Sequence, residues 1–328
     1  MSERAVRLTQ AGGPDVMQVQ TVEVGDPGPG EIRIRQKAAG LNFIDIYQRS
    51  GVYDIPMPSG LGLEGAGVVE AVGEGVTHLR VGDRVAYASQ PIGAYATARV
   101  MPARCVVRLP DGLSFAQGAA MMLKGLTVQY LLRKTLPPGG LQAGDAIVFH
   151  AAAGGVGLIA CQWAKALGLR LIATAGSDAK CELALAHGAA VAINYQRENF
   201  ADRVKEITGG EGVKVVYDSV GASTFEGSLA CLRPFGLMVS FGNASGKVPP
   251  VPITALATKG LYLTRPSIFH HLSSREATQA MADDLFQVVS SGQVKISVEQ
   301  RYALEDVQRA HREMESRSTT GAGVLMLD

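Results

Sequence analysis

The sequence predicts an α/β protein of two domains, a small β-barrel and a doubly wound parallel sheet. Its length of 328 residues is more than one domain usually holds. The segment from Gly60 to Gly82 carries seven glycines between short valine-rich pieces, which indicates a strongly bent barrel. From residue 146 onward, short apolar runs alternate with amphipathic segments, and repeated β-α-β units of this length imply a doubly wound sheet.

The first hundred residues are predicted to be all-β. In "EIRIRQKA", Ile32 and Ile34 alternate with Arg33 and Arg35, which is the period of a half-buried strand. "VGDRV", residues 81–85, is expected to form a turn between two such strands.

A helix is predicted next, because Ser114 and Gln117 have the spacing of a capping box. "TLPPGG" is a connector, and "AIVF", residues 146–149, is typical of a strand buried in a parallel sheet. After one amphipathic helix, further strands and helices are predicted in "LRLIATAG", "AKCELALAHG", "AVAINY", "FADRVKEITGG", "VKVVYDSVG", "TFEGSLACL", "GLMVSFGN" and "LYLTRPS".

The last part of the chain is predicted to be mixed. We expect a helix near residues 274–289, a strand in "ISVEQRYAL" and a final strand in "GVLML". The helix between these two strands is expected to bury one face, formed by Val307, Ala310, His311 and Met314.

Composition gives no support to several classes of function. Lys and Arg number 31 against 30 Asp and Glu, so the net charge of +1 gives no argument for nucleic acid or membrane binding. The four cysteines, Cys105, Cys161, Cys181 and Cys231, form no Cys-x-x-Cys pair, which favours free thiols in a reducing compartment. "MSERAVRLTQAGG" has no apolar core of signal-peptide length, and we expect a cytoplasmic protein.

"HAAAGGVG" has the pattern of a phosphate-binding elbow whose first glycine is replaced. Ala152, Gly154 and Gly157 fall on the three positions of G-x-G-x-x-G, between an apolar strand and an amphipathic helix. Gly154 would let the backbone approach a pyrophosphate, Gly157 would let helix and strand pack closely, and the helix N-terminus would supply N–H groups. The alternative is a glycine-rich turn that binds nothing.

The next strand favours NADP over NAD. An NAD-binding strand usually ends in an acid about twenty residues after the glycines. Here Gly176 and Ser177 occupy that place and Lys180 follows, and a serine with a lysine would accept a 2′-phosphate. Asp178 would restore the acid if the register moved by one residue, and Lys180 has the alternative of a solvated helix lysine.

These residues resemble the zinc-independent quinone oxidoreductases of the medium-chain dehydrogenase/reductase superfamily, the group that includes ζ-crystallin. The resemblance rests on "AAAGGVGLIACQWAKALG", "INY", "VVYDSVG", "GLMVSFGN" and "TRPS", and earlier on "AAGLNFIDIYQRSG", "GLGLEGAGVVEAVGEGV", "VGDRV" and "LKGLTVQYLL". It implies a GroES-like β-barrel catalytic domain over residues 1–125 and 266–328, a Rossmann domain over residues 126–265, and NADPH in the cleft.

The same resemblance implies a site without metal. Zinc alcohol dehydrogenases of this superfamily ligate catalytic zinc with a cysteine and a Gly-His-Glu. The corresponding positions here are Asn42 and "GLE", with Leu63 in place of the histidine, and these side chains do not supply the ligands that zinc requires. The substrate should then accept hydride without Lewis-acid help, and an electron-poor quinone does so.

Site residues follow from the resemblance. Asn42 and Tyr47 are the catalytic candidates, and Tyr47 is the best placed to hydrogen-bond the substrate oxygen or deliver a proton. Tyr53, Lys124 and Thr127 are implied for the substrate pocket. The implied cofactor-binding residues are Phe43, Ile44, Tyr47, Thr127, Gly154, Gly155, Val156, Gly157, Gly176, Ser177, Lys180, Tyr195, Val220, Phe241, Gly242, Asn243, Pro266, Ser267, Ile268 and Arg317. Ser177, Lys180, Tyr195 and Arg317 are expected around the 2′-phosphate.

The leading hypothesis is NADPH-dependent reduction of quinones without metal. The enzymatic alternative is NADPH-dependent reduction of the C=C bond of enones, enals or enoyl thioesters. A binding or structural role, including the RNA binding attributed to some relatives, gains no support from a nearly neutral chain. A homodimer through the Rossmann domains is expected from the resemblance, with the apolar run Leu261–Thr264 as a candidate edge strand.

Overall fold

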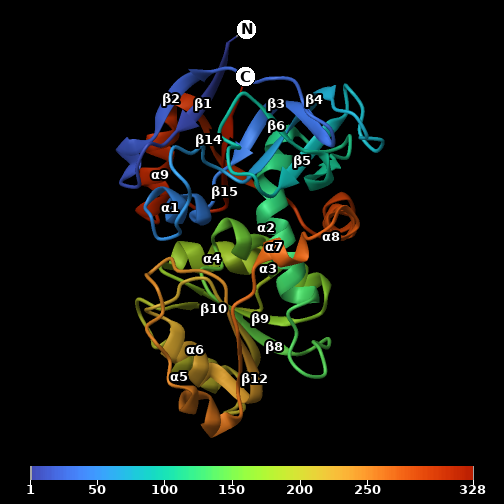
Figure 1. Cartoon of the computed structure of the whole chain (residues 1–328). Helices are drawn as coiled ribbons and strands as arrows, with labels where there is room; N and C mark the ends of the chain where they lie inside the picture. The colour runs from blue at the N-terminus through green and yellow to red at the C-terminus, as the bar shows by residue number, and fades with distance from the viewer. Residues whose placement is uncertain (1, 328) are drawn as a thin grey trace. The chain divides into compact units, whose positions relative to one another are not determined.

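The computed structural model describes residues 2–327, which form two compact units (Figure 1). Unit 1 contains the chain up to Leu126, the segment Phe269–Ser290 and the chain from Ile296 onward. Unit 2 contains Thr127–Ile268 and Ser291–Lys295. Unit 1 is therefore discontinuous, with contributions from both chain ends.

The division between the units lies at 126/127 and 268/269, where the sequence placed it at 125/126 and 265/266. Ser291–Lys295, which the sequence prediction assigned to the barrel, belongs to unit 2. There the Gln162 side chain donates to Lys295 O at 3.1 Å and accepts from Lys295 N at 2.8 Å. These contacts between a side chain and a distant backbone leave no periodic signal in the sequence.

Unit 1 is a β structure built around one mixed sheet. The sheet runs in the order β14-β15-β3-β4-β5-β7, with β6 also paired to β3, and β1 pairs with β2 separately. The strands are β1 (Glu3–Arg7), β2 (Gln18–Val22), β3 (Glu31–Gly40), β4 (Glu64–Val72), β5 (Arg84–Ala88), β6 (Ala98–Pro102), β7 (Val106–Arg108), β14 (Val298–Ala303) and β15 (Ala322–Met326). The helices are α1 (Phe43–Arg49), α8 (Arg275–Ser290) and α9 (Val307–Glu315), with 3-10 turns η1 (Pro14–Val16), η2 (Ala103–Cys105) and η4 (Leu304–Asp306).

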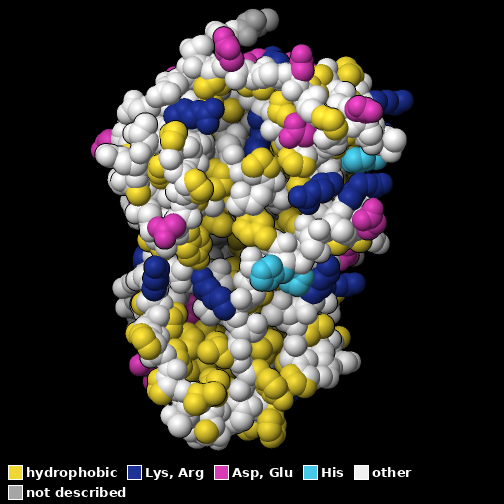
Figure 2. Space-filling view, viewed as in Figure 1, with side chains coloured by type: hydrophobic (Ala, Val, Ile, Leu, Met, Phe, Trp, Pro, Cys, Tyr) yellow, Lys and Arg dark blue, Asp and Glu magenta, His cyan; other side chains and the backbone are white. Residues whose placement is uncertain are grey.

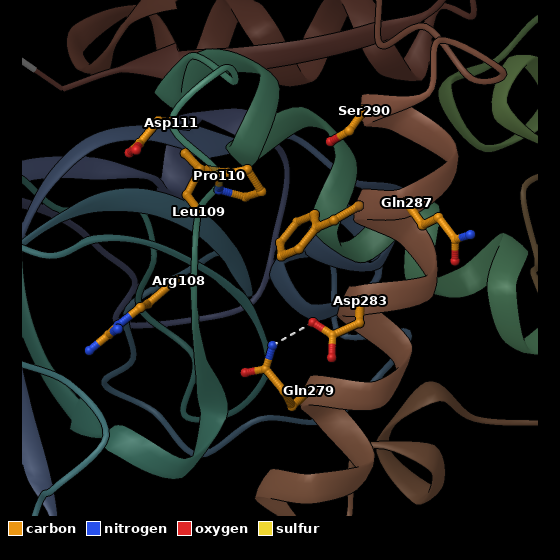
Figure 3. Close-up of a pocket in the computed structure, with 9 residues that line it drawn as sticks. Arg108, Leu109, Pro110, Asp111, Gln279, Asp283, Gln287 and Ser290 are labelled. Atoms are coloured by element: carbon orange, nitrogen blue, oxygen red, sulfur yellow. Dashed lines mark hydrogen bonds between the residues drawn. The ribbon is translucent and has the colours of Figure 1, made fainter.

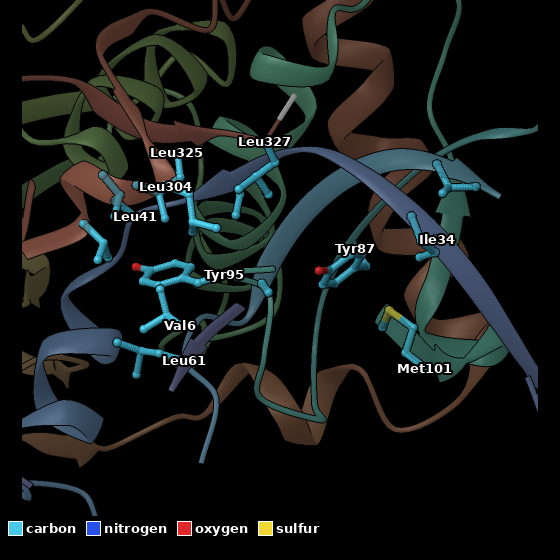
Figure 4. Close-up of a cluster of buried hydrophobic side chains, with 14 of the residues drawn as sticks. Val6, Ile34, Leu41, Leu61, Tyr87, Tyr95, Met101, Leu304, Leu325 and Leu327 are labelled. Atoms are coloured by element: carbon cyan, nitrogen blue, oxygen red, sulfur yellow. The ribbon is translucent and has the colours of Figure 1, made fainter. Parts of the chain in front are cut away.

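The core of unit 1 lies inside this bent sheet. Ile32 and Ile34 are fully buried, which confirms the alternation predicted for β3. The β3–β4 pairing shifts register at two places, and a Cβ added at Gly67 would collide with the backbone of Arg35. Glycine is therefore required where the strands approach closely. Figure 4 shows part of the buried cluster, including Val6, Ile34, Leu41, Leu61, Tyr87, Tyr95, Met101, Leu304, Leu325 and Leu327.

Unit 2 is a doubly wound parallel sheet with the strand order β10-β9-β8-β11-β12-β13. Its strands are β8 (Ala146–Phe149), β9 (Arg170–Ala175), β10 (Val191–Asn194), β11 (Val213–Asp218), β12 (Leu232–Ser240) and β13 (Tyr262–Thr264). Its helices are α3 (Gly155–Ala166), α4 (Asp178–Ala186), α5 (Phe200–Ile207) and α6 (Phe225–Cys231), with the turn η3 (Ile253–Lys259), and α5 and α6 pack side by side (Figure 1). The order reverses beside β8, and ligands of such sheets bind at the carboxyl ends of the strands at that point.

Two helices span the division between the units. α2 (Phe115–Arg133) begins after a reciprocal capping box, because Ser114 N donates to Gln117 Oε1 at 3.0 Å and Gln117 N donates to Ser114 Oγ at 3.2 Å. This confirms the predicted helix start. α7 (Ile268–His271) is a single turn at the second crossing. No helix within residues 2–327 has the length and apolar character needed to cross a membrane.

The prediction that the first hundred residues are all-β is wrong at one place. They contain α1, which starts after Asn42. The Asn42 backbone N–H donates to Asp45 Oδ2 at 2.9 Å, so the helix start is stabilised by a side chain of its own first turn. The helix is only seven residues long, which is too short for a 3.6-residue period to stand out.

Candidate active site

The glycine-rich elbow joins β8 to α3. Gly154 is the N-cap of α3, and a Cβ added there would meet only Ala151 O, at 3.3 Å. At Gly157 an added Cβ would lie 2.5 Å from the backbone of Ala152, so glycine is what allows the helix to pack on the loop. The twelve-residue α3 begins beside this space, and its unpaired N–H groups fit the pyrophosphate of a dinucleotide.

The carboxyl end of β9 brings together the residues predicted at the adenosine end of the cofactor within unit 2. Ser177 is the N-cap of α4, and its Oγ accepts from Lys180 N at 3.3 Å. A Cβ added at Gly176 would lie 2.6 Å from the hydroxyl of Tyr195, so a glycine is needed here for the tyrosine side chain to pack in this position. Tyr195 is 39% exposed, which leaves it accessible to a ligand.

Asp178, the acid that left the cofactor assignment open, is already engaged. Arg197 Nη2 lies 2.5 Å from Asp178 Oδ2, and Asn194 Nδ2 donates to Asp178 Oδ1 at 2.7 Å. Both carboxylate oxygens therefore have partners within unit 2, and the negative charge is paired. This arrangement fits a 2′-phosphate nearby better than a ribose hydroxyl bound by a free acid.

Two more loops follow at the same edge of the sheet. Asp218 Oδ1 accepts the backbone N–H of Val220 at 2.7 Å. A Cβ added at Gly242 would collide with the backbone of Ser219, so glycine allows the loop with Phe241 and Asn243 to touch the loop with Val220.

The stretch from Arg265 to Ile268 joins this group. Arg265 Nη1 donates to Ser240 Oγ at 3.1 Å and to Gly242 O at 3.0 Å. Pro266 and Ser267 are half-buried, and Ile268 is buried at the start of α7. The loop with Val220, the loop with Gly242 and the stretch that starts at Arg265 thus contact one another.

A buried carboxylate organises the predicted catalytic face of unit 1. Glu64, fully buried at the start of β4, accepts from Asn42 Nδ2 at 2.8 Å and from Lys124 Nζ at 3.0 Å. Its other oxygen accepts the Leu123 backbone N–H at 2.8 Å. A Cβ added at Gly40 would collide with this carboxylate. One side chain therefore holds both Asn42 and Lys124, which the sequence had assigned separately.

The exposed side of α1 carries the aromatic candidates. The ring of Tyr47 lies edge-on to the ring of Tyr53, with centroids 5.3 Å apart. Phe43 is 39% exposed, and its ring centroid lies 6.4 Å from that of Tyr47. Ile44 is half-buried on the same helix. The structure brings Tyr47 and Tyr53 together, whereas Thr127 belongs to unit 2.

The opposite side of α1 is anchored by buried ionisable groups. Asp45 Oδ2 accepts from Asn42 N at 2.9 Å and from Tyr95 Oη at 2.7 Å. Burial raises the pKa of Asp45 to about 7, although both hydrogen bonds oppose the shift. Tyr95 Oη also lies 3.3 Å from His311 Nε2, and burial lowers the pKa of His311 to about 3. The helix that bears Tyr47 is therefore fixed on its buried side by a polar cluster.

Arg317 is the one adenosine-end candidate that belongs to unit 1. It follows α9 with left-handed backbone, at φ 56°, and its side chain is exposed. It belongs to unit 1, whereas Ser177 and Lys180 belong to unit 2. Its contact with the 2′-phosphate stays a prediction.

A hollow of unit 1 lies elsewhere, between β7 and α8 (Figure 3). Gln279 and Asp283 meet there at 2.7 Å on successive turns of α8. The lining residues are Arg108, Leu109, Pro110, Asp111, Gln279, Asp283, Phe286, Gln287 and Ser290. None of them is a predicted site residue, so this hollow is distinct from the predicted site.

The chain matches two family models. Residues 28–111 match the alcohol dehydrogenase GroES-like domain, and residues 155–287 match the zinc-binding dehydrogenase model. The quinone oxidoreductase of Pseudomonas aeruginosa is 53% identical over 325 residues, which cover 98% of this chain and 99% of that protein. The chain belongs to the quinone oxidoreductase family. The predicted membership of the medium-chain dehydrogenase/reductase superfamily and the predicted fold class are confirmed.

Solved structures of this quinone oxidoreductase family agree. The Escherichia coli quinone oxidoreductase complexed with NADPH has a TM-score of 0.96 and 49% identity, covering 98% of this chain and 99% of that chain. The 2-haloacrylate reductase of Burkholderia is 41% identical, covering 98% of both chains. The family thus includes a relative named for a C=C substrate as well as relatives named for quinones.

In this chain, the positions that correspond to zinc ligands in zinc alcohol dehydrogenases carry side chains with other roles. Leu63 is fully buried, and the amide of Asn42 donates to Glu64. Among residues 2–327, no group of three or more His, Cys, Asp and Glu side chains could hold a metal ion.

Four buried residues of the site regions escaped the sequence interpretation. They are Asp45, Glu64, His150 and Asp218. A signal existed for Glu64, because it ends the "GLE" that was compared with a zinc-ligand motif. A signal also existed for Asp45, which follows Asn42 with the same capping-box spacing as Ser114 and Gln117. For His150 and Asp218, the partners lie far apart in sequence or within one short turn, and no spacing rule would have found them.

Proposed function

We propose that this protein transfers hydride from NADPH to quinones. The observation that carries the proposal is the likeness of nearly the whole chain to quinone oxidoreductases, one of which was solved with NADPH. The site supports it, because the elbow at Gly154 fits a pyrophosphate and the acid Asp178 is paired by Arg197. Steady-state oxidation of NADPH and NADH with a panel of quinones tests the proposal, and quinone reduction with NADPH favoured is the expected result.

The chain's own residues would bind and orient the reactants. NADPH, when bound, supplies the hydride, and the quinone takes up that hydride and one proton to become a hydroquinone. Tyr47 donates a hydrogen bond to one quinone oxygen. The ring of Tyr53 packs edge-on against the ring of Tyr47. Glu64 holds Asn42 and Lys124 as fixed polar groups, which keeps them from reorienting during the reaction. Because the reduced ring is an acidic phenol, water can deliver the remaining proton.

The reaction is proposed to need no metal. Its support is the buried Leu63 and the Asn42 amide at the positions where relatives with zinc have ligands. Elemental analysis of the purified protein should find far less than one zinc per chain, and chelators should leave activity unchanged. About one bound zinc per chain, with activity lost to chelators, would overturn this part of the proposal.

A second candidate is reduction of a C=C bond conjugated to a carbonyl or carboxylate. The likeness to 2-haloacrylate reductase favours it. Adding enones, enals, enoyl thioesters and haloacrylates to the quinone panel separates the two functions. A kcat/KM on one of these substrates above that on every quinone would reverse the order of the candidates.

The protein is also proposed to be a homodimer through unit 2. β13 is an edge strand of the six-stranded sheet, as expected for Leu261–Thr264, and it is parallel to its single neighbour β12. On this edge Tyr262 and Leu263 are 46% and 40% exposed. Phe235 in β12 and Ile253 in η3 are further exposed apolar side chains of unit 2. Figure 2 shows apolar side chains gathered over the part of unit 2 that carries α5, α6 and β12. An unpaired apolar edge fits the same edge of a second copy.

A further inference from the structure

We propose that Thr174, His150, Ser228 and Asp218 form a buried hydrogen-bonded relay that positions three nucleotide-binding loops of unit 2 and thereby sets affinity for the whole dinucleotide. The inference rests on the proposed function for the presence of a dinucleotide. It goes further by assigning positioning roles to residues outside the predicted site.

The relay is continuous and enclosed. His150 Nδ1 lies 2.7 Å from Thr174 Oγ1, and His150 Nε2 lies 2.9 Å from Ser228 Oγ. Ser228 Oγ in turn donates to Asp218 Oδ2 at 2.9 Å. All four residues are at most 1% exposed, and the ring of Phe200 lies edge-on to the imidazole with centroids 4.9 Å apart. A cofactor therefore cannot touch the relay atoms, and their effect on it must pass through other residues.

The geometry fixes the direction of each hydrogen bond. Asp218 accepts four hydrogen bonds, from Val220 N, Gly221 N, Thr224 Oγ1 and Ser228 Oγ, which suits an ionised carboxylate. The Ser228 hydroxyl donates its only proton to Asp218, so its oxygen must accept a hydrogen bond from His150 Nε2. The imidazole is then protonated on Nε2, and its Nδ1 accepts from Thr174. Burial lowers the pKa of His150, in agreement with a neutral ring.

Each end of the relay holds a loop of the candidate site. His150 directly follows β8 and is the first residue of the glycine-rich elbow. Thr174 lies in β9 shortly before Gly176, and its carbonyl accepts the Ala152 N–H of the elbow at 3.1 Å. Asp218 ends β11 and holds Val220. Since β9, β8 and β11 are neighbours in the sheet, the relay crosses the carboxyl ends of three adjacent strands.

Ser228→Ala cuts the relay in the middle and leaves Asp218 its three other donors. The loss of this coupling should raise the Kd of both NADPH and NADH by the same factor, about 3–10-fold, as expected for one internal hydrogen bond. Because the change lies away from the reacting atoms, KM for the cofactor should rise while kcat stays within about twofold. An equal effect on both cofactors separates this device from a contact to the 2′-phosphate.

Thr208→Val is the matched control. Its hydroxyl donates to Val204 O at 2.8 Å and accepts from Gly212 N at 3.0 Å, at the opposite, amino-terminal end of β11. This variant should lose thermal stability without losing cofactor affinity. If Thr208→Val weakened cofactor binding as much as Ser228→Ala, the effect would be general loosening and the positioning role would be wrong. Should Ser228→Ala fail to fold, Thr174→Val cuts the relay at its other end.

A spectroscopic test is independent of activity. Long-range ¹H–¹⁵N spectra of the His150 ring should show the Nε2–H tautomer in the wild-type protein, with or without NADPH. The same signals should change in Ser228→Ala. A wild-type ring protonated on Nδ1, or unchanged cofactor Kd values in Ser228→Ala, would overturn the relay. Failure of wild-type protein to bind either dinucleotide would instead contradict the proposed function.

Discussion

The hydroxyl of Tyr95 donates to Asp45 Oδ2 across 2.7 Å in the interior of unit 1, where both side chains are almost fully buried. Burial raises the pKa of Asp45 to about 7, so between about pH 4 and pH 7 the folded protein holds a proton that the unfolded chain has released. This contribution to stability is present at low pH and is lost as the pH rises through 7.

Asp45→Asn should therefore become more stabilising, relative to wild type, as the pH rises from 4 to 8. The expected change in the difference of unfolding free energy is on the order of 4 kcal/mol, because the pKa of Asp45 is raised from 3.8 to about 7. His311, with a pKa lowered to about 3, has the opposite pH dependence, but it is present in both proteins and cancels in the comparison. Urea unfolding at several pH values measures the difference. A difference independent of pH would show that Asp45 is not the titrating group.

Lys180→Ala should raise KM for NADPH about tenfold and leave kcat near its original value. A charge-assisted contact to the 2′-phosphate contributes roughly 1.5–3 kcal/mol, part of which is lost at a solvent-exposed site. The contact lies far from the hydride and acts as uniform binding. Steady-state kinetics with NADH should barely change. Equal weakening of both cofactors would contradict the placement of the 2′-phosphate beside Lys180.

Arg197→Ala should lower kcat/KM for NADPH, because it leaves the charge of Asp178 unpaired near the phosphate. The expected loss is about 3–10-fold, since the pair is partly solvent-exposed. The double variant Arg197→Ala/Asp178→Asn should recover most of that loss. If Arg197 instead bound the phosphate itself, the double variant would stay as weak as the single one.

The matched control for this prediction is Arg203→Ala. Arg203 is also an exposed arginine paired with carboxylates, at 3.7 Å from Glu198 and 2.6 Å from Glu206. Its removal should leave the ratio of NADPH to NADH kcat/KM unchanged. If Arg203→Ala shifted that ratio as much as Arg197→Ala, the effect would come from the change in net charge and not from the pairing of Asp178.

Tyr47→Phe should lower turnover on quinones by less than about tenfold. General acid catalysis is typically worth 10²–10⁴-fold, but the hydroquinone anion can take its proton from water. Turnover and the Kd of NADPH should be measured on the same preparation. A loss beyond 10²-fold at unchanged cofactor affinity would make Tyr47 an obligatory proton donor and favour the C=C substrates.

Leu263→Lys should shift the protein from dimer to monomer in sedimentation velocity at micromolar concentration. A lysine on the exposed edge strand would lie against its own symmetry mate, and charges are excluded from the centre of such interfaces. Leu185→Lys is the control, because Leu185 is similarly exposed at 44% on α4, away from that edge. A wild-type monomer, or a dimer that tolerates Leu263→Lys, would count against this interface.

Regular periods in the sequence predicted most of the fold. Val307, Ala310, His311 and Met314 are all buried on α9, as their spacing required. The β-α-β units of unit 2 followed from alternating apolar runs, and Gly157 was predicted to allow the close packing that its geometry demands. These features depend on local spacing, which a single sequence displays.

The parts that escaped prediction depend on contacts between distant residues. Glu64 and Lys124 are 60 residues apart, and His150 and Ser228 are 78 apart. Buried polar groups must be hydrogen-bonded, but the sequence does not say by whom. The site could therefore be located at its loops and glycines, while the buried groups that hold those loops became visible only in the folded chain.

The division of the chain has a consequence for its synthesis. Nearly all of unit 2 is one continuous stretch that ends by Lys295, so it can pack while the last barrel strands are still inside the ribosome. Unit 1 cannot be finished in the same way, because β3, made early, pairs along one side with β15, made last. Because β6 pairs only with residues 31–35 of β3, residues 38–40 stay an open strand edge until β15 is made, and that edge is available to other nascent chains. A ribosome that stalls after residue 295 would thus release a chain with a nucleotide-binding unit able to fold and a barrel prone to aggregate.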